Sequence, residues 1–159
     1  NVMPFKNAKK ITNIERTQWC WMFFRKSLFD EWFRFENQFM KYSLMEDCFL
    51  SYWIQEKYPN SLFFVPNIKL IHCESPASRI ANKQRIYQNI IHRYYFIKKF
   101  NKSYPAYLWT MFIFSIFDFI QYRTFKIFKF YIEWLKYVRK NKDRIWNPDF
   151  DFNEFIFWD

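Results

Sequence analysis

Two polar clusters in this chain contain residue types that carry acid–base and metal chemistry. Glu46 and Asp47 form a pair of adjacent carboxylates at the start of a segment with a helical pattern. His72 follows a hydrophobic run further along the chain. Carboxylates and imidazoles are common proton-exchanging groups in enzyme sites. Carboxylates at the mouth of a helix and a histidine at the end of a strand fit a site built on loops that rigid elements hold in place.

Each of these residues also has an ordinary structural explanation. Ser43 and Glu46 have the S-x-x-E spacing of a capping box, in which each side chain binds a free backbone N–H group at the start of a helix. Asp47 would then only interact favourably with the positive end of the helix dipole. A single histidine at the end of a strand is often structural as well. From the residues alone, both interpretations stay open.

The elements that would position the two clusters follow from apolar periodicity and turn residues. Residues 44–57 are predicted to form the helix that carries the two acids, with an apolar face of Phe49, Leu50, Trp53 and Ile54. After a turn at Pro59, strands are predicted at residues 62–65 and 68–71, so that the second strand ends at His72. The remaining predictions for the first two thirds are a polar loop at 1–16, a buried strand at 18–24, and helices at 26–33 and 79–100. The predicted buried side of the last helix consists of Ile80, Tyr87, Ile90, Ile91, Tyr94 and Ile97.

The last third of the chain is more apolar than the rest. Residues 104–120 are almost wholly hydrophobic, but they are on the short side for crossing a bilayer, and cations flank them on both sides. Residues 125–140 predict a helix with a narrow polar stripe of Lys126, Lys129, Glu133, Lys136 and Lys140 and an aromatic remainder. Such a helix can lie in a membrane interface, or it can pack on the protein's own core with its stripe in water. We expect this helix to lie in a membrane interface.

Composition narrows the class of partner. The chain has 159 residues, a net charge of +10 and 26% aromatic residues, a mixture that suits either nucleic acid or an anionic membrane surface. No nucleic-acid-binding motif accompanies it, so no nucleic acid is expected. The three cysteines, Cys20, Cys48 and Cys73, form no disulfide or zinc pattern, which indicates buried thiols in a reducing compartment.

The order of several short motifs resembles the C-terminal half of the catalytic domain in family 2 glycosyltransferases. In that family, M-x-x-R precedes a helix, Y-S-L-G-E-D and S-Y follow, and a strand ends in P-x-x-x-x-x-H-x-x-S-P-x-x-R. The matching positions here are Met22 and Arg25, residues 42–47 with the letters Y-S-L-M-E-D, Ser51-Tyr52, and Pro66 to Arg79 with His72 between them. The similarity covers roughly residues 19–99, about half of the chain.

The resemblance implies an α/β fold: the C-terminal portion of a GT-A type nucleotide-sugar transferase domain, followed by hydrophobic and amphipathic helices. It implies inverting sugar transfer, with Asp47 as the base and Glu46 supporting it or contacting the acceptor. His72 corresponds to the family's histidine near the metal and the diphosphate. Arg79 is a candidate phosphate clamp because its guanidinium fork matches phosphate oxygens, or else a solvated arginine in the first turn of a helix. Independently of the resemblance, Trp21 could stack on an acceptor sugar or pack in the core.

The same resemblance implies a divalent cation, Mg or Mn, bound largely by a nucleotide-binding half that we expect before Asn1. The expected partners are a nucleotide-sugar donor, a glycan or lipid-linked acceptor and a membrane surface, at the cytoplasmic face of the cell membrane. The expected divisions are catalytic residues 1–103, membrane-associating helices 104–145 and a polar-aromatic tail 146–159. Without the donor-binding half, the chain alone is expected to be inactive. The alternative is a non-catalytic basic, aromatic-rich module that binds membranes or nucleic acid.

One departure from the family is the complete lack of glycine. Cys20, Lys41 and Met45 stand where the family often has glycine. Glycine is the usual residue where the backbone takes a positive φ or approaches a ligand closely. At these positions the chain must therefore adopt a positive φ, or approach a ligand closely, with a side chain present.

Overall fold

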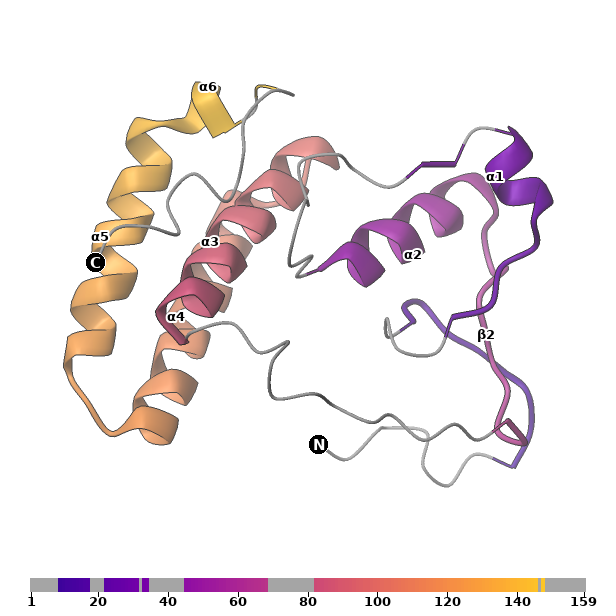
Figure 1. Ribbon diagram of the computed structural model, residues 1–159, viewed down its shortest axis with the longest axis horizontal. Coiled ribbons are helices and arrows are strands. Elements are labelled where there is room, and N and C mark those ends of the chain that lie inside the picture. Colours follow the sequence, from indigo (N-terminus) through magenta and orange to yellow (C-terminus); the bar gives the residue numbers. More distant parts are fainter. Residues whose placement is uncertain are drawn as a thin grey trace. The chain divides into compact units, whose positions relative to one another are not determined.

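The computed structural model describes residues 9–17, 22–31, 33–34, 45–68, 82–145 and 147. The chain divides into two compact units: Asn1–Glu36 with Met45–Arg79, and Asn37–Leu44 with Ile80–Asp159. Most of the described residues are helical, and the described strands form one two-stranded sheet (Figure 1). Helices and a sheet thus occur together, as an α/β class requires, but helix predominates strongly.

The sheet of the first unit pairs two short strands. β1, Thr12–Asn13, runs antiparallel to β2, Phe63–Phe64. The pairing continues where the Ile14 N–H group donates to the Leu62 carbonyl oxygen at 3.0 Å. β2 falls within the predicted strand at 62–65, whereas β1 lies in a stretch that was predicted to be a loop. That prediction is wrong for Thr12–Asn13 because strand pairing uses backbone groups, which a polar sequence does not reveal.

Two helices accompany this sheet: α1, Ser27–Glu31, and α2, Glu46–Lys57. The core of the first unit consists of Phe33, Leu50, Ile54 and Leu62. Residues 22–25, part of which was predicted to be a buried strand, have no regular structure, so that prediction is wrong there. Met22 and Phe24 nevertheless pack against the core, which explains why their apolar pattern looked like a strand. Residues 69–71, most of the second predicted strand, lie outside the described residues.

The second unit is built on three long helices: α3, Asn82–Lys99, α4, Tyr104–Tyr122, and α5, Lys126–Lys140, each of which packs on the other two. A short α6, Lys142–Ile145, follows (Figure 1). Ser103 caps the start of α4, and its side chain accepts a hydrogen bond from the Ala106 N–H group at 3.3 Å. Serine is a favoured residue at that position because it satisfies a backbone N–H group that the helix leaves free.

The apolar face that the sequence predicted for α3 is buried. Ile90 and Ile91 are completely inaccessible, and Tyr87 and Tyr94 are nearly so. The hydroxyl of Tyr107 on α4 donates to the Ile90 carbonyl oxygen at 3.1 Å. The predicted buried side is confirmed at these four residues, Ile97 is only half-buried, and Ile80 lies outside the described residues. The contact from Tyr107 joins α4 to the middle of α3.

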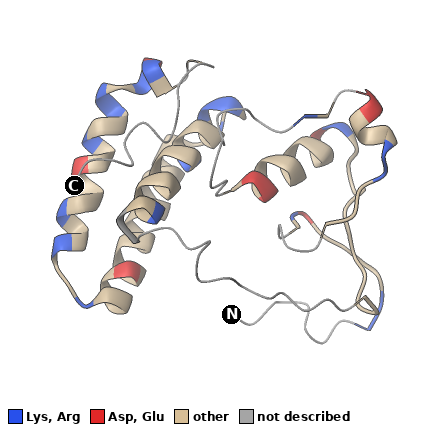
Figure 2. Ribbon diagram, viewed as in Figure 1, with Lys and Arg blue, Asp and Glu red and all other residues tan. Residues whose placement is uncertain are grey.

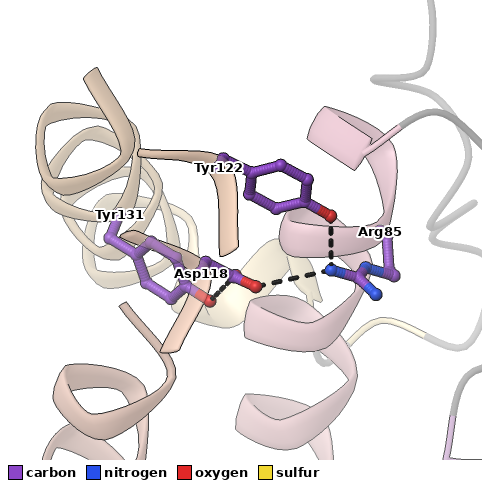
Figure 3. A network of polar contacts seen from close by, with 4 residues as sticks. All are labelled: Arg85, Asp118, Tyr122 and Tyr131. Carbon is purple, nitrogen blue, oxygen red and sulfur yellow. Dashed lines mark hydrogen bonds and ion pairs between the residues drawn. The ribbon is translucent and has the colours of Figure 1, made fainter. Parts of the chain in front are cut away.

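One carboxylate connects all three long helices (Figure 3). Asp118 on α4 is only 8% exposed, and its Oδ2 accepts a hydrogen bond from the Tyr131 hydroxyl of α5 at 2.7 Å. Its Oδ1 lies 3.4 Å from Nη2 of Arg85 on α3, and the same nitrogen donates to the Tyr122 hydroxyl at 2.7 Å. A buried charge is tolerated when it is paired and hydrogen-bonded, and here both oxygens have a partner.

The buried phenols of this unit must stay neutral. Burial, the hydrogen bond to Asp118 and the charge of Asp118 all raise the pKa of Tyr131 far above its usual value of 10.0. Burial raises the pKa of Tyr107 in the same way. When the folded-state pKa of a phenol exceeds the unfolded value, the resulting stability is fully present below the unfolded pKa and is lost as pH rises beyond it.

We therefore expect the free energy of unfolding to fall as pH rises above about 10, because unfolding releases phenols that ionise at their ordinary pKa. Tyr131→Phe should lower stability near pH 7 by about 2 kcal/mol, since Asp118 loses a donor. It should also make the alkaline decrease shallower. Chemical denaturation across this pH range measures both effects. Tyr104→Phe, which changes a more exposed tyrosine of α4, is the matched control, and an unchanged alkaline slope in Tyr131→Phe would contradict the assignment.

Candidate functional site

The paired acids occupy the first turn of α2, as the sequence predicted, but the helix starts differently. Met45 is the residue before the helix, with φ 72° and ψ 6°, and its own side chain makes no capping hydrogen bond. Glu46 is therefore the first helical residue and does not occupy the third position, as a capping box with Ser43 would require. The capping-box interpretation is wrong, because the left-handed backbone of Met45 sets the start of the helix two residues later.

Asp47 is half-buried and turns one oxygen toward its own helix. Its Oδ1 accepts a hydrogen bond from the Cys48 N–H group at 2.8 Å, which is one of the first-turn donors that a helix leaves free. This contact fits the alternative in which the carboxylate stabilises the positive end of the helix. No donor in the described part of the chain reaches the second oxygen, Oδ2.

Residues 16 and 17, which precede the motif-bearing part of the chain, contact α2 close to Asp47. The sequence did not predict this contact. The Thr17 N–H group donates to Oγ of the buried Ser51 at 3.0 Å. Ser51 in turn donates to the Asp47 carbonyl oxygen at 2.7 Å. Nη1 of Arg16 lies 3.4 Å from the Cys48 sulfur, so a guanidinium sits beside the residue that follows Asp47. A basic residue in a polar stretch gives no sequence signal for this position.

Three expected site residues lie outside the described residues: Trp21, His72 and Arg79. The distance between Asp47 and His72 therefore remains a prediction, namely that the carboxylate and the imidazole flank one ligand. In the residues that the structure describes, no three His, Cys, Asp or Glu side chains gather into a group that could hold a metal. Since His72 is not among those residues, the expected metal contact also stays a prediction.

The second unit presents a basic surface on α5. Lys126, Lys129, Lys136 and Lys140 are all exposed, as the polar stripe predicted, and Figure 2 shows the Lys and Arg positions along this helix. Part of the aromatic side of α5 packs within the protein. Tyr131 is buried, and the ring of Trp134 lies 4.4 Å from that of Tyr87 on α3. Phe125 and Ile132 are more than half exposed, and the expectation that residues 125–140 lie in a membrane interface stays a prediction.

α4 keeps an exposed apolar surface even though one side is packed. Trp109, Phe112, Phe117 and Ile120 are each more than half exposed. In the part of the chain that the structure describes, no helix has the length and apolar character needed to cross a membrane. The apolar run at 104–120 thus forms a surface helix with hydrophobic side chains on both sides.

No model of a known protein family, no curated protein and no solved structure matches this chain. Function is therefore inferred from the motifs and from the geometry of the described residues.

The backbone at Met45 gives a direct test of the site's geometry. A residue with a Cβ atom costs roughly 1 kcal/mol in the left-handed region, and glycine does not carry this cost. We expect Met45→Gly to be more stable than Met45→Ala by about 1 kcal/mol, measured by urea denaturation. At Glu56, an exposed position inside the same helix, the order should reverse, with alanine more stable than glycine by about 1 kcal/mol. The same order at both positions would contradict a left-handed Met45.

Proposed function

We propose that this chain is the C-terminal part of the catalytic domain of a family 2-like glycosyltransferase of GT-A fold. It would take part in inverting transfer from a nucleotide sugar to a cell-surface polysaccharide or a lipid-linked acceptor. The observation that carries the proposal is the conformation of Met45. The family has glycine at this position of the Y-S-L-G-E-D motif, and Met45 adopts the positive φ that favours glycine. The positive φ of Met45 supports the proposal, because it is a conformation that suits a glycine at this position.

In the proposed reaction, a base removes the proton from an acceptor hydroxyl while the oxygen attacks the anomeric carbon. The bond to the nucleoside diphosphate breaks on the opposite side, so the anomeric configuration inverts. Asp47 is the proposed base. Its Oδ1 is held by the Cys48 N–H group, which orients the carboxylate and leaves Oδ2 to receive the proton. Positioning of this kind is what a general base needs to act on a bound hydroxyl.

Apart from that of Trp21, the other roles follow the resemblance. Glu46 would support Asp47 or contact the acceptor, Arg79 would bind the diphosphate, and Trp21 would stack on a sugar. A divalent cation, Mg or Mn, would neutralise charge on the leaving diphosphate, with His72 as this chain's contribution to its site. The proposed proton transfer is assigned to Asp47 alone.

Asp47→Asn in the full-length protein should lower the rate of sugar transfer by about 10²–10⁴, because the amide keeps the shape but cannot take up the proton. The amide oxygen can still accept from the Cys48 N–H group, so folding and donor binding should be largely retained. Transfer from labelled nucleotide sugars and donor binding measure the two effects. Glu56→Gln makes the same chemical change at an exposed position of α2 and should have no effect. Turnover of Asp47→Asn within a few-fold of wild type would show that the base lies elsewhere.

We also propose that the chain associates with the cytoplasmic face of the membrane, where lipid-linked acceptors are found. The exposed lysines of α5 support this proposal, because anionic headgroups attract such side chains. The same surface supports the second candidate function, a binding module without chemistry. Loss of transfer in Asp47→Asn distinguishes the two, since a module has no transfer to lose.

Charge reversal at Lys126, Lys129 and Lys136 should weaken binding to anionic vesicles by about 100-fold, since each well-placed lysine contributes about 1 kcal/mol. Thermal stability should hardly change, because these side chains are exposed and the Lys129–Glu133 ion pair, at 3.8 Å, lies on the surface. Vesicle co-sedimentation measures the binding. Reversal of Lys9, Lys10 and Lys26 gives the same change in net charge within the first unit. Equal weakening by both triple variants would show that α5 has no special role.

A further inference from the structure

The polarity of α4 is reversed relative to an ordinary surface helix. Its one charged residue, Asp118, points inward to Arg85 and Tyr131 (Figure 3). The opposite side is apolar along the length of the helix. Amphipathic helices in water have charged and polar residues on the outward side, so α4 has the pattern expected of a helix whose outer side meets an apolar phase.

The outer side of α4 can be defined by helical spacing from its buried residues. Tyr107, Met111, Ser115 and Asp118 are buried and follow one stripe. The residues that point away from this stripe form what we call the α4 outer face: Trp109, Phe112, Ile113, Ile116, Phe117 and Ile120. Trp109 is 65% exposed, and Phe117 and Ile120 are each 62% exposed. A contiguous exposed apolar surface of this kind marks a site of interaction with a membrane or another molecule.

Both ends of α4 are positively charged. Lys98 and Lys102 precede the helix, and Arg123 and Lys126 follow it; all four are exposed. The helix has 19 residues and is therefore about 28 Å long. If α4 lay in the plane of a membrane, both cationic ends would reach the anionic headgroups of the same leaflet. A crossing orientation would instead place one end on each side.

We infer that α4 lies in the plane of an anionic bilayer surface, with its outer face in the lipid and both cationic ends among the headgroups. This inference rests on the membrane association proposed above and identifies the surface that inserts. A second copy of the chain fits less well. Because both ends of α4 are cationic, pairing two outer faces in either direction would bring like charges together. An anionic lipid surface complements the apolar face and the two ends simultaneously.

The first test is the substitution of the outer face by charge. Trp109→Glu with Phe117→Glu should weaken binding to vesicles of phosphatidylcholine and phosphatidylglycerol by at least about tenfold, because the aromatic side chains can no longer be buried. The matched control is Ile11→Glu with Phe23→Glu, which replaces two equally exposed apolar residues of the first unit and should bind like the wild type. Circular dichroism and thermal unfolding check that both variants are folded. Equal weakening by both variants would overturn the inference.

A second measurement uses a variant that keeps the apolar face. Trp109→Phe should bind vesicles like the wild type but lose a large part of the tryptophan quenching by brominated lipids. Quenching of the wild type should be stronger with bromine near the headgroups than near the bilayer centre, as an in-plane helix requires. Equal quenching in the wild type and Trp109→Phe would overturn the inference, as would stronger quenching at the centre.

The outcomes separate this inference from the proposed membrane association. Binding that depends on the α5 lysines but is unchanged in Trp109→Glu with Phe117→Glu would leave membrane association intact and overturn the role of α4. A change from dimer to monomer in that variant, seen by sedimentation without loss of vesicle binding, would show that the outer face binds a second copy. No binding of the wild type to either anionic or neutral vesicles would overturn both proposals.

Discussion

The arrangement of the helical unit depends on how a single charge inside it is neutralised. Removing a carboxylate from water costs several kcal/mol unless a cation and hydrogen-bond donors replace the solvent. Asp118 obtains both from other helices, through Arg85 and Tyr131, so α3, α4 and α5 must meet in one way at this point. Asp118 is the one charged residue of α4, so the outer face of this helix carries no charge.

Local periodicity was sufficient to predict the long helices and the buried side of α3, because those features depend on residues three and four positions apart. The role of Asp118 was not predictable in this way. Its partners lie 33 and 13 positions away in the sequence, and only the packing of the three helices brings them together. Similarly, β1 was missed because its partner strand begins some 50 residues later and the pairing involves backbone groups.

The candidate site shows the same division between local and long-range information. Asp47 was identified through the motif around it, and its position on the first turn of α2 followed from the helical pattern. The contacts of Thr17 with Ser51 and of Arg16 with Cys48 span 34 and 32 positions, and no local pattern indicates them. They connect residues 16 and 17 to the first half of α2, beside Asp47. Support of this kind is what the proposed role of Asp47 as a base would require.

The left-handed backbone at Met45 is one of four such positions among the described residues, together with Asn60, Asn101 and Arg123. None of them is glycine, since the chain contains no glycine. Two are asparagine, the residue that tolerates this conformation best after glycine. Met45 and Arg123 are therefore the two of these positions whose side chains suit the backbone least. An evolving relative could introduce glycine at any of the four without moving the chain, whereas glycine inside a helix would weaken it. The backbone conformation thus identifies the positions at which glycine could replace the present residue.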